Sequence, residues 1–342
     1  MRPLVSVVIP SFNAAQFIIR CLDSVFRQSV DSLEVIVVDD ASTDDTAHVV
    51  SQYGAPNLTL IRQPQNQGVC AARNRGAEFA SGEWIAVMDA DDWMSPHRLE
   101  YLVRDARRLQ ADIVVDDVYL VPEANVEALF NHTVLERQDR SSPPLPHRRL
   151  FSSSLRSQLP RAIDASFFVR HNMPGPRNPR LGLTKPLIRT DWLRQHGVQF
   201  DPDVGVSNDF KFCVDCFRHN PVFYILDHTT YYYVLQESGI TKTSDPLRAD
   251  SHRLEVTLQL MQSPDFADPD LQKAFSERVR ALERQIRFHR FRQSIESKSG
   301  AGVARQALRT PTDAFSYVRQ RSISQFDRQA NRCRRGFKRL FF

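Results

Sequence analysis

The stretch Trp84-Ile85-Ala86-Val87-Met88-Asp89-Ala90-Asp91-Asp92 carries the strongest signal in this chain. Its five leading apolar residues predict a short buried strand, and the acidic residues follow where that strand ends. Residues two apart in an extended segment point the same way, so Asp89 and Asp91 direct two carboxylates at one point. Oxygen ligands of this kind suit a hard divalent ion such as Mg²⁺ or Mn²⁺. The alternative is an acidic turn that only caps the next helix.

Strand-like and helix-like segments alternate around this stretch through the first 120 residues. Apolar and β-rich runs at residues 4–10, 34–38, 58–62, 84–88 and 113–115 predict strands. The segments between them show helical spacing or helix-start residues. This alternation predicts an α/β fold with a central, mostly parallel sheet flanked by helices. Such sheets bind ligands in the crevice at the carboxyl ends of their strands, which is where the acidic residues fall.

The rest of the chain is organised differently. Residues 121–180 contain eight prolines and break any regular period, which predicts long loops and short helices that cover one side of the sheet. Periodic segments then return and include an expected helix at residues 210–217. From about residue 251 the pattern is helical and basic. We therefore divide the chain into residues 1–120, 121–250 and 251–342.

Composition limits the classes of protein that fit. The chain has 342 residues, 42% of them hydrophobic, which is enough for a sizeable core. No apolar run reaches the roughly 18 to 20 residues of a membrane span. The five cysteines are scattered and odd in number, which indicates a reducing compartment, so we expect a cytoplasmic protein. Cys213 and Cys216 form a lone CxxC, for which burial in a helix is favoured over a redox or metal role.

The charge is unevenly distributed. The net charge is +5, yet residues 271–342 hold 18 basic and 5 acidic residues, so the remainder is mildly acidic. This basic extension also carries bulky apolar residues, among them Phe288, Phe291 and Ile295, a mixture suited to lying peripherally on an anionic membrane surface. A solvated tail is the equal alternative. Nucleic acid is not expected as a partner, because no recognisable binding module accompanies the charge.

Three more side chains are expected at the same sheet edge as the acidic stretch. Phe12 follows the first strand and offers an aromatic face for stacking on a flat base. Asp40 follows the second strand, where its carboxylate can accept a hydrogen bond from a base N–H. Arg73, on a helix, can pair with phosphate or brace the acidic residues. Each also has an ordinary structural alternative: a core position for Phe12, a helix cap for Asp40 and a surface salt bridge for Arg73.

Three stretches, VSVVIPSFNAAQFI, VIVVDDASTDDT and NQGVCAARNRGAEFASGEWIAVMDADDW, resemble the nucleotide-binding half of bacterial family 2 glycosyltransferases. The resemblance is close over residues 4–120 and loose over residues 181–242. It implies the glycosyltransferase-A fold, which is Rossmann-like. The first of our three parts is then the nucleotide-sugar-binding half of the catalytic domain, the second is the acceptor-side half, and the third is a basic helical extension.

The resemblance also implies roles on the donor side. The residues concerned are Pro10, Phe12 and Asp40 for the base, usually uracil, Arg73 beside the nucleotide pocket, Asp89 for the ribose, and Asp91 for the metal. Asp89 is a second candidate ligand of that metal, which is Mn²⁺ or Mg²⁺. A divalent ion of this kind stabilises the departing diphosphate as a Lewis acid.

For the acceptor side, the resemblance implies that Asp209 is the catalytic base. The family has an acidic pair at the start of a helix there, and Asn208 replaces its first acid. The alternative for Asp209 is an ordinary helix N-terminal residue that the helix dipole favours. Lys185 matches a family lysine near phosphate or acceptor, with a solvated lysine as the alternative. These positions decide how the acceptor hydroxyl would lose its proton.

An aromatic stretch at residues 231–236 departs from the family pattern. The family often continues such a strand with Arg, whereas Val234 and Gln236 are uncharged here. Gly239 stands where the family usually has Ser. All three changes lie in the acceptor half, so they bear on which acceptor is used.

Together these observations predict a metal-dependent inverting glycosyltransferase. We expect it to move a sugar from a nucleotide sugar, a UDP-sugar in particular, to a hydroxyl of a polysaccharide, lipopolysaccharide or glycolipid. The alternative is a catalytically weak glycosyltransferase-like binding module that docks on a membrane or a partner. A nucleotidyltransferase ranks below both, because a Gly-rich phosphate loop with a following Lys is missing near Pro10.

Overall fold

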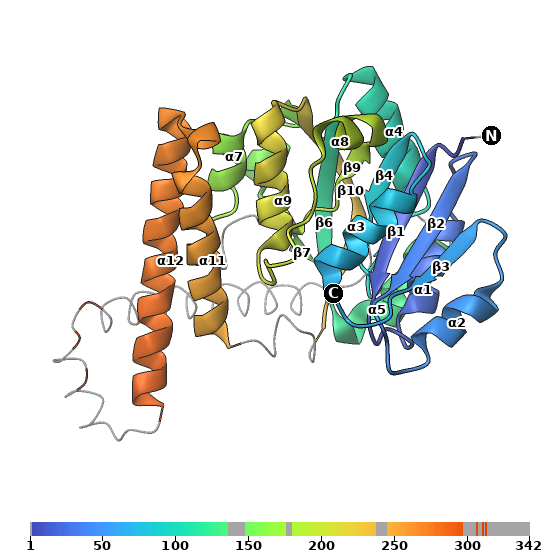
Figure 1. Ribbon diagram of the computed structural model, residues 1–342, viewed down its shortest axis with the longest axis horizontal. Helices are drawn as coiled ribbons and strands as arrows, with labels where there is room; N and C mark the ends of the chain where they lie inside the picture. The colour runs from blue at the N-terminus through green and yellow to red at the C-terminus, as the bar shows by residue number, and fades with distance from the viewer. Residues whose placement is uncertain are drawn as a thin grey trace, which may run out of the picture.

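A single sheet forms the centre of the computed structural model, which describes residues 2–135, 148–175, 180–236 and 245–296 together with residues 306, 310 and 312. The strands of the described residues are β1 Val5–Ser11, β2 Leu33–Asp39, β3 Leu58–Arg62, β4 Trp84–Val87, β5 Trp93–Met94, β6 Ile113–Pro122, β7 Arg148–Arg149, β8 Arg161–Ala162, β9 Leu187–Arg189 and β10 Phe223–Leu235. Their order is β3-β2-β1-β4-β9-β6-β10-β5, with β7 on β6 and β8 on β10 (Figure 1).

The parallel core of the sheet is built from the first four long strands. Val7 of β1 pairs with Val35 of β2 on one side and with Ala86 of β4 on the other. Every residue of β1 is buried, as expected for a parallel strand that helices cover on both faces. β6 and β10 form a second parallel pair, and β9 lies antiparallel between β4 and β6. The predicted α/β fold with a mostly parallel sheet is therefore confirmed.

Helices flank this sheet. Those of the described residues are α1 Ile18–Phe26, α2 Thr46–Tyr53, α3 Val69–Phe79, α4 Arg98–Arg108, α5 Val126–Phe130, α6 Ser153–Arg156, α7 Ala165–Arg170, α8 Thr190–His196, α9 Asn208–Cys216, α11 Pro246–Gln262 and α12 Pro269–Ile295. Short helices and turns fill residues 123–135 and 150–175, as the proline-rich composition predicts. The expected helix at residues 210–217 is α9, which begins two residues earlier.

The contact between α3 and β1 depends on one glycine. A Cβ added at Gly76 would lie 2.3 Å from Cγ1 of Val8, so only glycine lets the helix approach this closely. Arg73 lies one turn earlier on the same helix. The close approach therefore carries the Arg73 side chain to the carboxyl end of the sheet, where the site is built.

The C-terminal part begins as a pair of helices. α11 and α12 lie side by side at the end of the molecule opposite β3, with α9 between them and the sheet (Figure 1). α12 buries Leu271, Ala274, Phe275, Arg278 and Leu282, which recur at helical spacing. The predicted helical extension is thus present as far as Ile295. The most basic stretch, residues 332–342, lies outside the described residues.

The described residues contain no helix long and apolar enough to cross a membrane. Of the expected apolar anchors on α12, Phe291 is buried, whereas Phe288 and Ile295 are half-buried. The described part of the extension therefore uses one of its anchors for packing. The division of the chain into residues 1–120, 121–250 and 251–342 stays a prediction.

Candidate active site

Asp89 lies just beyond the end of β4 and is held by two cations. Its Oδ1 accepts a hydrogen bond from Nη2 of Arg73 at 2.8 Å, and its Oδ2 lies 2.7 Å from Nζ of Lys185. Burial alone would raise the pKa of Asp89, but the charges of Lys185 and Arg73 hold it well below its usual value. Asp89 is therefore a carboxylate whose charge is already balanced by the protein.

Arg73 joins this acid to the start of α9. Its Nη1 donates to Oδ1 of Asp209 at 2.7 Å and to Oδ1 of Asn208 at 3.0 Å. The Arg73 side chain is only 4% exposed, so the alternative of a surface salt bridge is wrong. Although burial lowers the pKa of Arg73, the charges of Asp209 and Asp89 raise it above its ordinary value. One buried guanidinium thus fixes two acids that lie 120 positions apart in the sequence.

Lys185 is the second buried cation that contacts both acids. Its ammonium lies 3.9 Å from Oδ2 of Asp209, in addition to its contact with Asp89. The side chain is 2% exposed, so the alternative of a solvated lysine is wrong. Although burial lowers the pKa of Lys185, the charges of Asp209 and Asp89 raise it above its usual value. Lys185 remains cationic while it is shielded from water.

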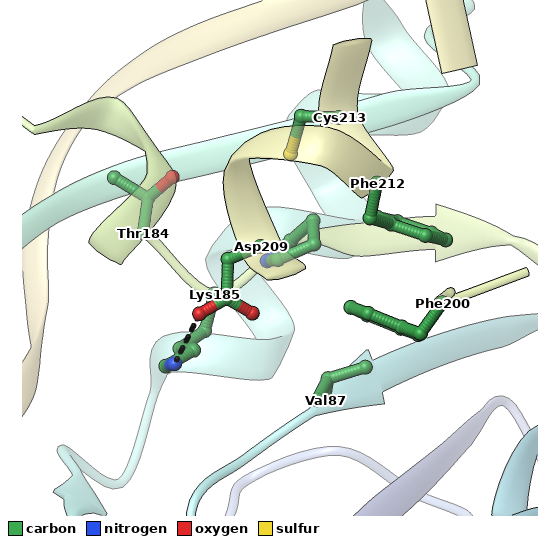
Figure 2. A pocket seen from close by; sticks show the side chains of 8 residues that line it. Val87, Thr184, Lys185, Phe200, Asp209, Phe212 and Cys213 are labelled. Carbon is green, nitrogen blue, oxygen red and sulfur yellow. Dashed lines mark ion pairs between the residues drawn. The ribbon is translucent and has the colours of Figure 1, made fainter. Parts of the chain in front are cut away.

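Figure 2 shows Asp209 and Lys185 at a small cavity. The side chains that line it come from β4, the segment before β9, the segment between α8 and α9, and α9 itself; they are Val87, Thr184, Lys185, Pro186, Phe200, Asp209, Phe212 and Cys213. Phe200 stacks on Phe212 at 4.0 Å between ring centroids. The Asp209 carboxylate therefore lies between the aromatic side of this cavity and the buried cations Arg73 and Lys185.

The Asp91 carboxylate, unlike that of Asp89, forms no ion pair among the described residues. Its Oδ2 accepts a hydrogen bond from Nε2 of Gln236 at 3.2 Å. Burial and the negative charge of Asp89 raise the pKa of Asp91 to about 6. A carboxylate in this setting is stabilised by an added positive charge, which is the property required of a metal ligand.

The described residues contain no cluster of three or more His, Cys, Asp or Glu side chains that could hold a metal ion by itself. Asp91 does fit a divalent ion that completes its shell with phosphate oxygens and water, which is the common mode for Mg²⁺. Asp89 could join it only by sharing the carboxylate that Arg73 and Lys185 already hold. The predicted metal roles of Asp91 and Asp89 stay predictions.

Asp92 has a positioning role that the sequence analysis missed. Its Oδ2 accepts a hydrogen bond from the Tyr231 hydroxyl at 2.7 Å, and its Oδ1 accepts one from the Val234 backbone N–H at 2.8 Å. The same Tyr231 oxygen accepts a hydrogen bond from the Asp89 N–H at 3.3 Å. These contacts tie the acidic turn to β10. The sequence did carry a signal for this role. Asp92 directly precedes the apolar Trp93, and a carboxylate buried beside such a residue requires hydrogen-bond partners.

The expected base-binding side chains lie at the ends of β1 and β2. Phe12 is 44% exposed, so the alternative of a core position is wrong. Asp40 is buried, and its carboxylate accepts hydrogen bonds from the backbone N–H groups of Gln67 and Gly68, both at 2.8 Å. Asp40 does not cap α2, whose N-cap is Asp45, but its bond to Gly68, the N-cap residue of α3, holds the start of that helix. Pro10 is buried within β1.

The remaining predicted positions that the structure describes, Val234, Cys213 and Cys216, are buried. Val234 is buried and acts through its backbone, and Gly239 lies outside the described residues. Cys213 and Cys216 are free thiols buried in α9. Burial raises the pKa of both thiols, which makes them poor nucleophiles. A structural role for this CxxC agrees with the expectation.

Comparison with known proteins identifies the family. The model of glycosyl transferase family 2 matches residues 6–174, which include β1 to β4 and the acidic turn. Residues 6–174 of the chain are therefore a glycosyl transferase family 2 domain. It is 27% identical to the succinoglycan biosynthesis protein ExoO of Rhizobium meliloti (strain 1021) over 310 residues, which cover 90% of this chain and 82% of that protein. This family 2 member is accordingly a glycosyltransferase.

Solved structures confirm the fold of this glycosyltransferase. The S. aureus TarS fragment 1–349 in complex with UDP-GlcNAc matches with a TM-score of 0.60 at 18% identity, over 95% of this chain and 92% of that chain. The mannosyltransferase PcManGT from Pyrobaculum calidifontis, in complex with GDP-Man and Mn²⁺, matches with a TM-score of 0.52 at 19% identity, over 95% and 88% of the two chains. The expected glycosyltransferase-A fold is confirmed.

Proposed function

We propose that this family 2 glycosyltransferase transfers a sugar, with inversion, from a nucleotide sugar to an acceptor hydroxyl, and that it requires a divalent ion. One observation carries the proposal. Arg73 holds Asp89, at the end of β4, and Asp209, at the start of α9, with contacts of 2.8 and 2.7 Å. A donor-side acid and an acceptor-side acid are thereby fixed relative to each other, which is what transfer between two bound molecules requires.

The donor is a nucleotide sugar, and we favour a UDP-sugar. Phe12 would stack on the base, Asp40 would face its N–H groups, and Pro10 would shape the strand that carries Phe12. The exposure of Phe12 supports this role, since the ring is free to meet a ligand. TarS, which shares the fold, was solved with UDP-GlcNAc, and PcManGT was solved with GDP-Man, so the fold accommodates both bases.

Asp91 would hold the divalent ion, Mn²⁺ or Mg²⁺, and Asp89 would contact the ribose or share the ion. When bound, the ion supplies positive charge to the leaving diphosphate. Lys185 and Arg73 add two further buried positive charges beside this position. Because they are largely shielded from water, their effect on developing negative charge is stronger than that of exposed cations.

Asp209 would take the proton of the acceptor hydroxyl. Its side chain is 29% exposed, so an acceptor can reach it, while Arg73 and Lys185 fix its orientation. Asn208 contributes an amide oxygen to Arg73 in place of the acid that the family often has. The acceptor we propose is a polysaccharide, lipopolysaccharide or glycolipid. The relative ExoO supports this class of acceptor, because it is named a succinoglycan biosynthesis protein.

We also propose that the enzyme works at the inner face of the cell membrane, with residues 271–342 on the anionic lipid surface. Arg280, Arg284 and Arg290 are exposed on the described part of α12 and would face the headgroups. Binding to phosphatidylglycerol vesicles that weakens with salt would support this location. Equal partition into vesicles of neutral phosphatidylcholine would contradict it.

The decisive experiment is calorimetric titration of UDP, GDP and dTDP, each with and without Mn²⁺, on wild type, Asp91→Ala and the control Asp203→Ala. Asp203 lies in an exposed turn before α9. Binding of one nucleotide that requires both Mn²⁺ and Asp91 is the expected result. If no nucleotide binds in a metal-dependent way, the acidic turn is structural, and the alternative of a glycosyltransferase-like binding module takes precedence.

A further inference from the structure

A cluster of arginines lies beside the acceptor side of the site and takes no part in the chemistry above. Arg180 precedes the segment that carries Lys185, Arg253 lies on α11, and Arg278 lies on α12. The guanidinium of Arg278 stacks on the Phe210 ring at 3.9 Å from its centroid. Phe210 directly follows Asp209 on α9, so Arg278 packs on the residue next to the proposed base.

The positive charge of this cluster is incompletely balanced. Asp250 is the acid beside it, and Asp250 already pairs with Arg253 at 2.6 Å and with His289 at 3.3 Å. Among the described residues, neither Arg180 nor Arg278 forms an ion pair. Two guanidinium charges therefore have no carboxylate partner in the part of the chain that the structure describes.

Arg278 is the more deeply buried of these two unpaired arginines. Its side chain is 4% exposed, and its Nε donates to Oγ1 of Thr257 at 3.1 Å, while its buried Nη1 has no hydrogen-bond partner in the structure. Burial and the charges of Arg253 and Arg180 lower the pKa of Arg278 to about 9. A buried cation without a counter-charge destabilises the fold unless an anion is supplied from outside.

We propose that Arg180 and Arg253, with the charge of Arg278 behind them, form a subsite for a phosphate group on the acceptor. Arg180 is exposed and the Arg253 side chain, beside Asp250, is 27% exposed, and the planar guanidinium groups of both match phosphate oxygens. A phosphate carries about two negative charges near neutral pH, which balances the two unpaired arginines, whereas a carboxylate would balance one. This proposal rests on the proposed function, because it takes the ligand to be the acceptor.

The position of the cluster indicates that the bound phosphate belongs to the acceptor and not to the nucleotide-sugar donor. α11 and α12 lie at the opposite end of the molecule from β1 to β3, where the nucleotide base is proposed to bind (Figure 1). Lys185, which contacts Asp209, lies 5.9 Å from the ring of Tyr233 on β10 and five residues after Arg180 in the chain. A phosphate held here would place an attached sugar hydroxyl on the Asp209 side of the site.

The test is titration calorimetry with inorganic pyrophosphate, farnesyl diphosphate below its micelle concentration, and glucuronate, all in EDTA. Wild type is compared with Arg180→Gln and with the control Arg248→Gln, whose exposed side chain lies on the same helix as Arg253. We expect Arg180→Gln to weaken pyrophosphate binding by about tenfold or more and Arg248→Gln to change it less than about twofold. Tighter binding of farnesyl diphosphate with the same dependence on Arg180 would identify a lipid-linked phosphate; equal binding would indicate a phosphate recognised without its lipid.

Three results would overturn the proposal: no binding of either phosphate compound, binding that is the same in wild type and Arg180→Gln, or glucuronate binding as tightly as pyrophosphate. Titration of UDP with Mn²⁺ on Arg180→Gln separates this proposal from the proposed function. Wild-type affinity for UDP in that variant, together with lost pyrophosphate binding, supports the subsite. Failure of wild type to bind any nucleotide refutes the proposed function. Pyrophosphate binding that depends on Arg180 would in that case still show a phosphate site, but not an acceptor site.

Discussion

Nη1 of Arg73 lies 2.7 Å from Oδ1 of Asp209, although 136 positions separate the two residues in the chain. The same guanidinium donates to Asp89 through its other terminal nitrogen. Exchanging this buried arginine for an uncharged side chain would leave Lys185 as the remaining cation at both acids. The contact therefore couples the stability of the fold to the geometry of the site.

Replacing Arg73 by Met should lower both stability and activity. Two carboxylates, 24% and 29% exposed, would lose a buried partner, so we expect the free energy of unfolding to fall by about 2 to 4 kcal/mol in urea denaturation. Sugar transfer should fall by about 100-fold or more, because the direct bridge between the two acids is lost and only Lys185 still contacts both. Arg75→Met is the matched control: its ion pair with Glu78 is exposed, and its loss should cost about 0.5 kcal/mol or less. Equal losses in the two variants would show that the buried contact adds nothing.

Asp209→Asn keeps the size of the side chain and removes the base. We expect the transfer rate to fall by about 10² to 10⁴, while UDP affinity stays within about twofold of wild type, because Asp209 lies on the acceptor side. Steady-state kinetics and titration calorimetry measure the two quantities, with Asp203→Asn as the control. A variant that retains wild-type turnover would remove Asp209 from the chemistry.

Asp91 should make the protein less stable as the pH rises from about 4 to 6. Its pKa is about 6 in the folded protein and about 3.9 when the chain is unfolded, so the unfolded state loses its proton first and is favoured by rising pH. In EDTA, Asp91→Asn should therefore match wild type near pH 4 and be more stable by about 1 to 3 kcal/mol at pH 7. Urea denaturation at several pH values measures this difference. A stability difference that does not change with pH would contradict the raised pKa.

Phe12→Ala should weaken nucleotide binding without harming the fold. The ring is 44% exposed, and losing its stacking on a base should reduce affinity by about fivefold or more. Phe79→Ala provides a control, because that ring is 48% exposed on α3 and no base is proposed to stack on it. Calorimetry with UDP and Mn²⁺ measures the affinities, and thermal melts should be nearly unchanged in both variants. The same loss in the two variants would refute a specific role for Phe12.

The periodic part of the sequence was enough to predict the sheet. The apolar runs before Pro10, Asp39 and Asp89 are all strands of the parallel core, and the expected helix around Phe210 is α9. Periodicity is a local property, which is why it can be deduced from neighbouring residues alone. The antiparallel strand β9 was not predicted, because three residues are too few to show a period.

The sequence by itself determined which acids follow which strands, and so the resemblance to a family, its fold and the place of Asp89 and Asp91 at the sheet edge. Only the tertiary structure brought Asp209 of α9 to Arg73, and with it to Asp89. It also decided how the charges are balanced, because Lys185 and Arg73 pair with Asp89, whereas the Asp91 carboxylate accepts a hydrogen bond from Gln236. A carboxylate and its cation attract each other according to their separation and burial in space. Both quantities arise only when segments distant in the chain are packed together.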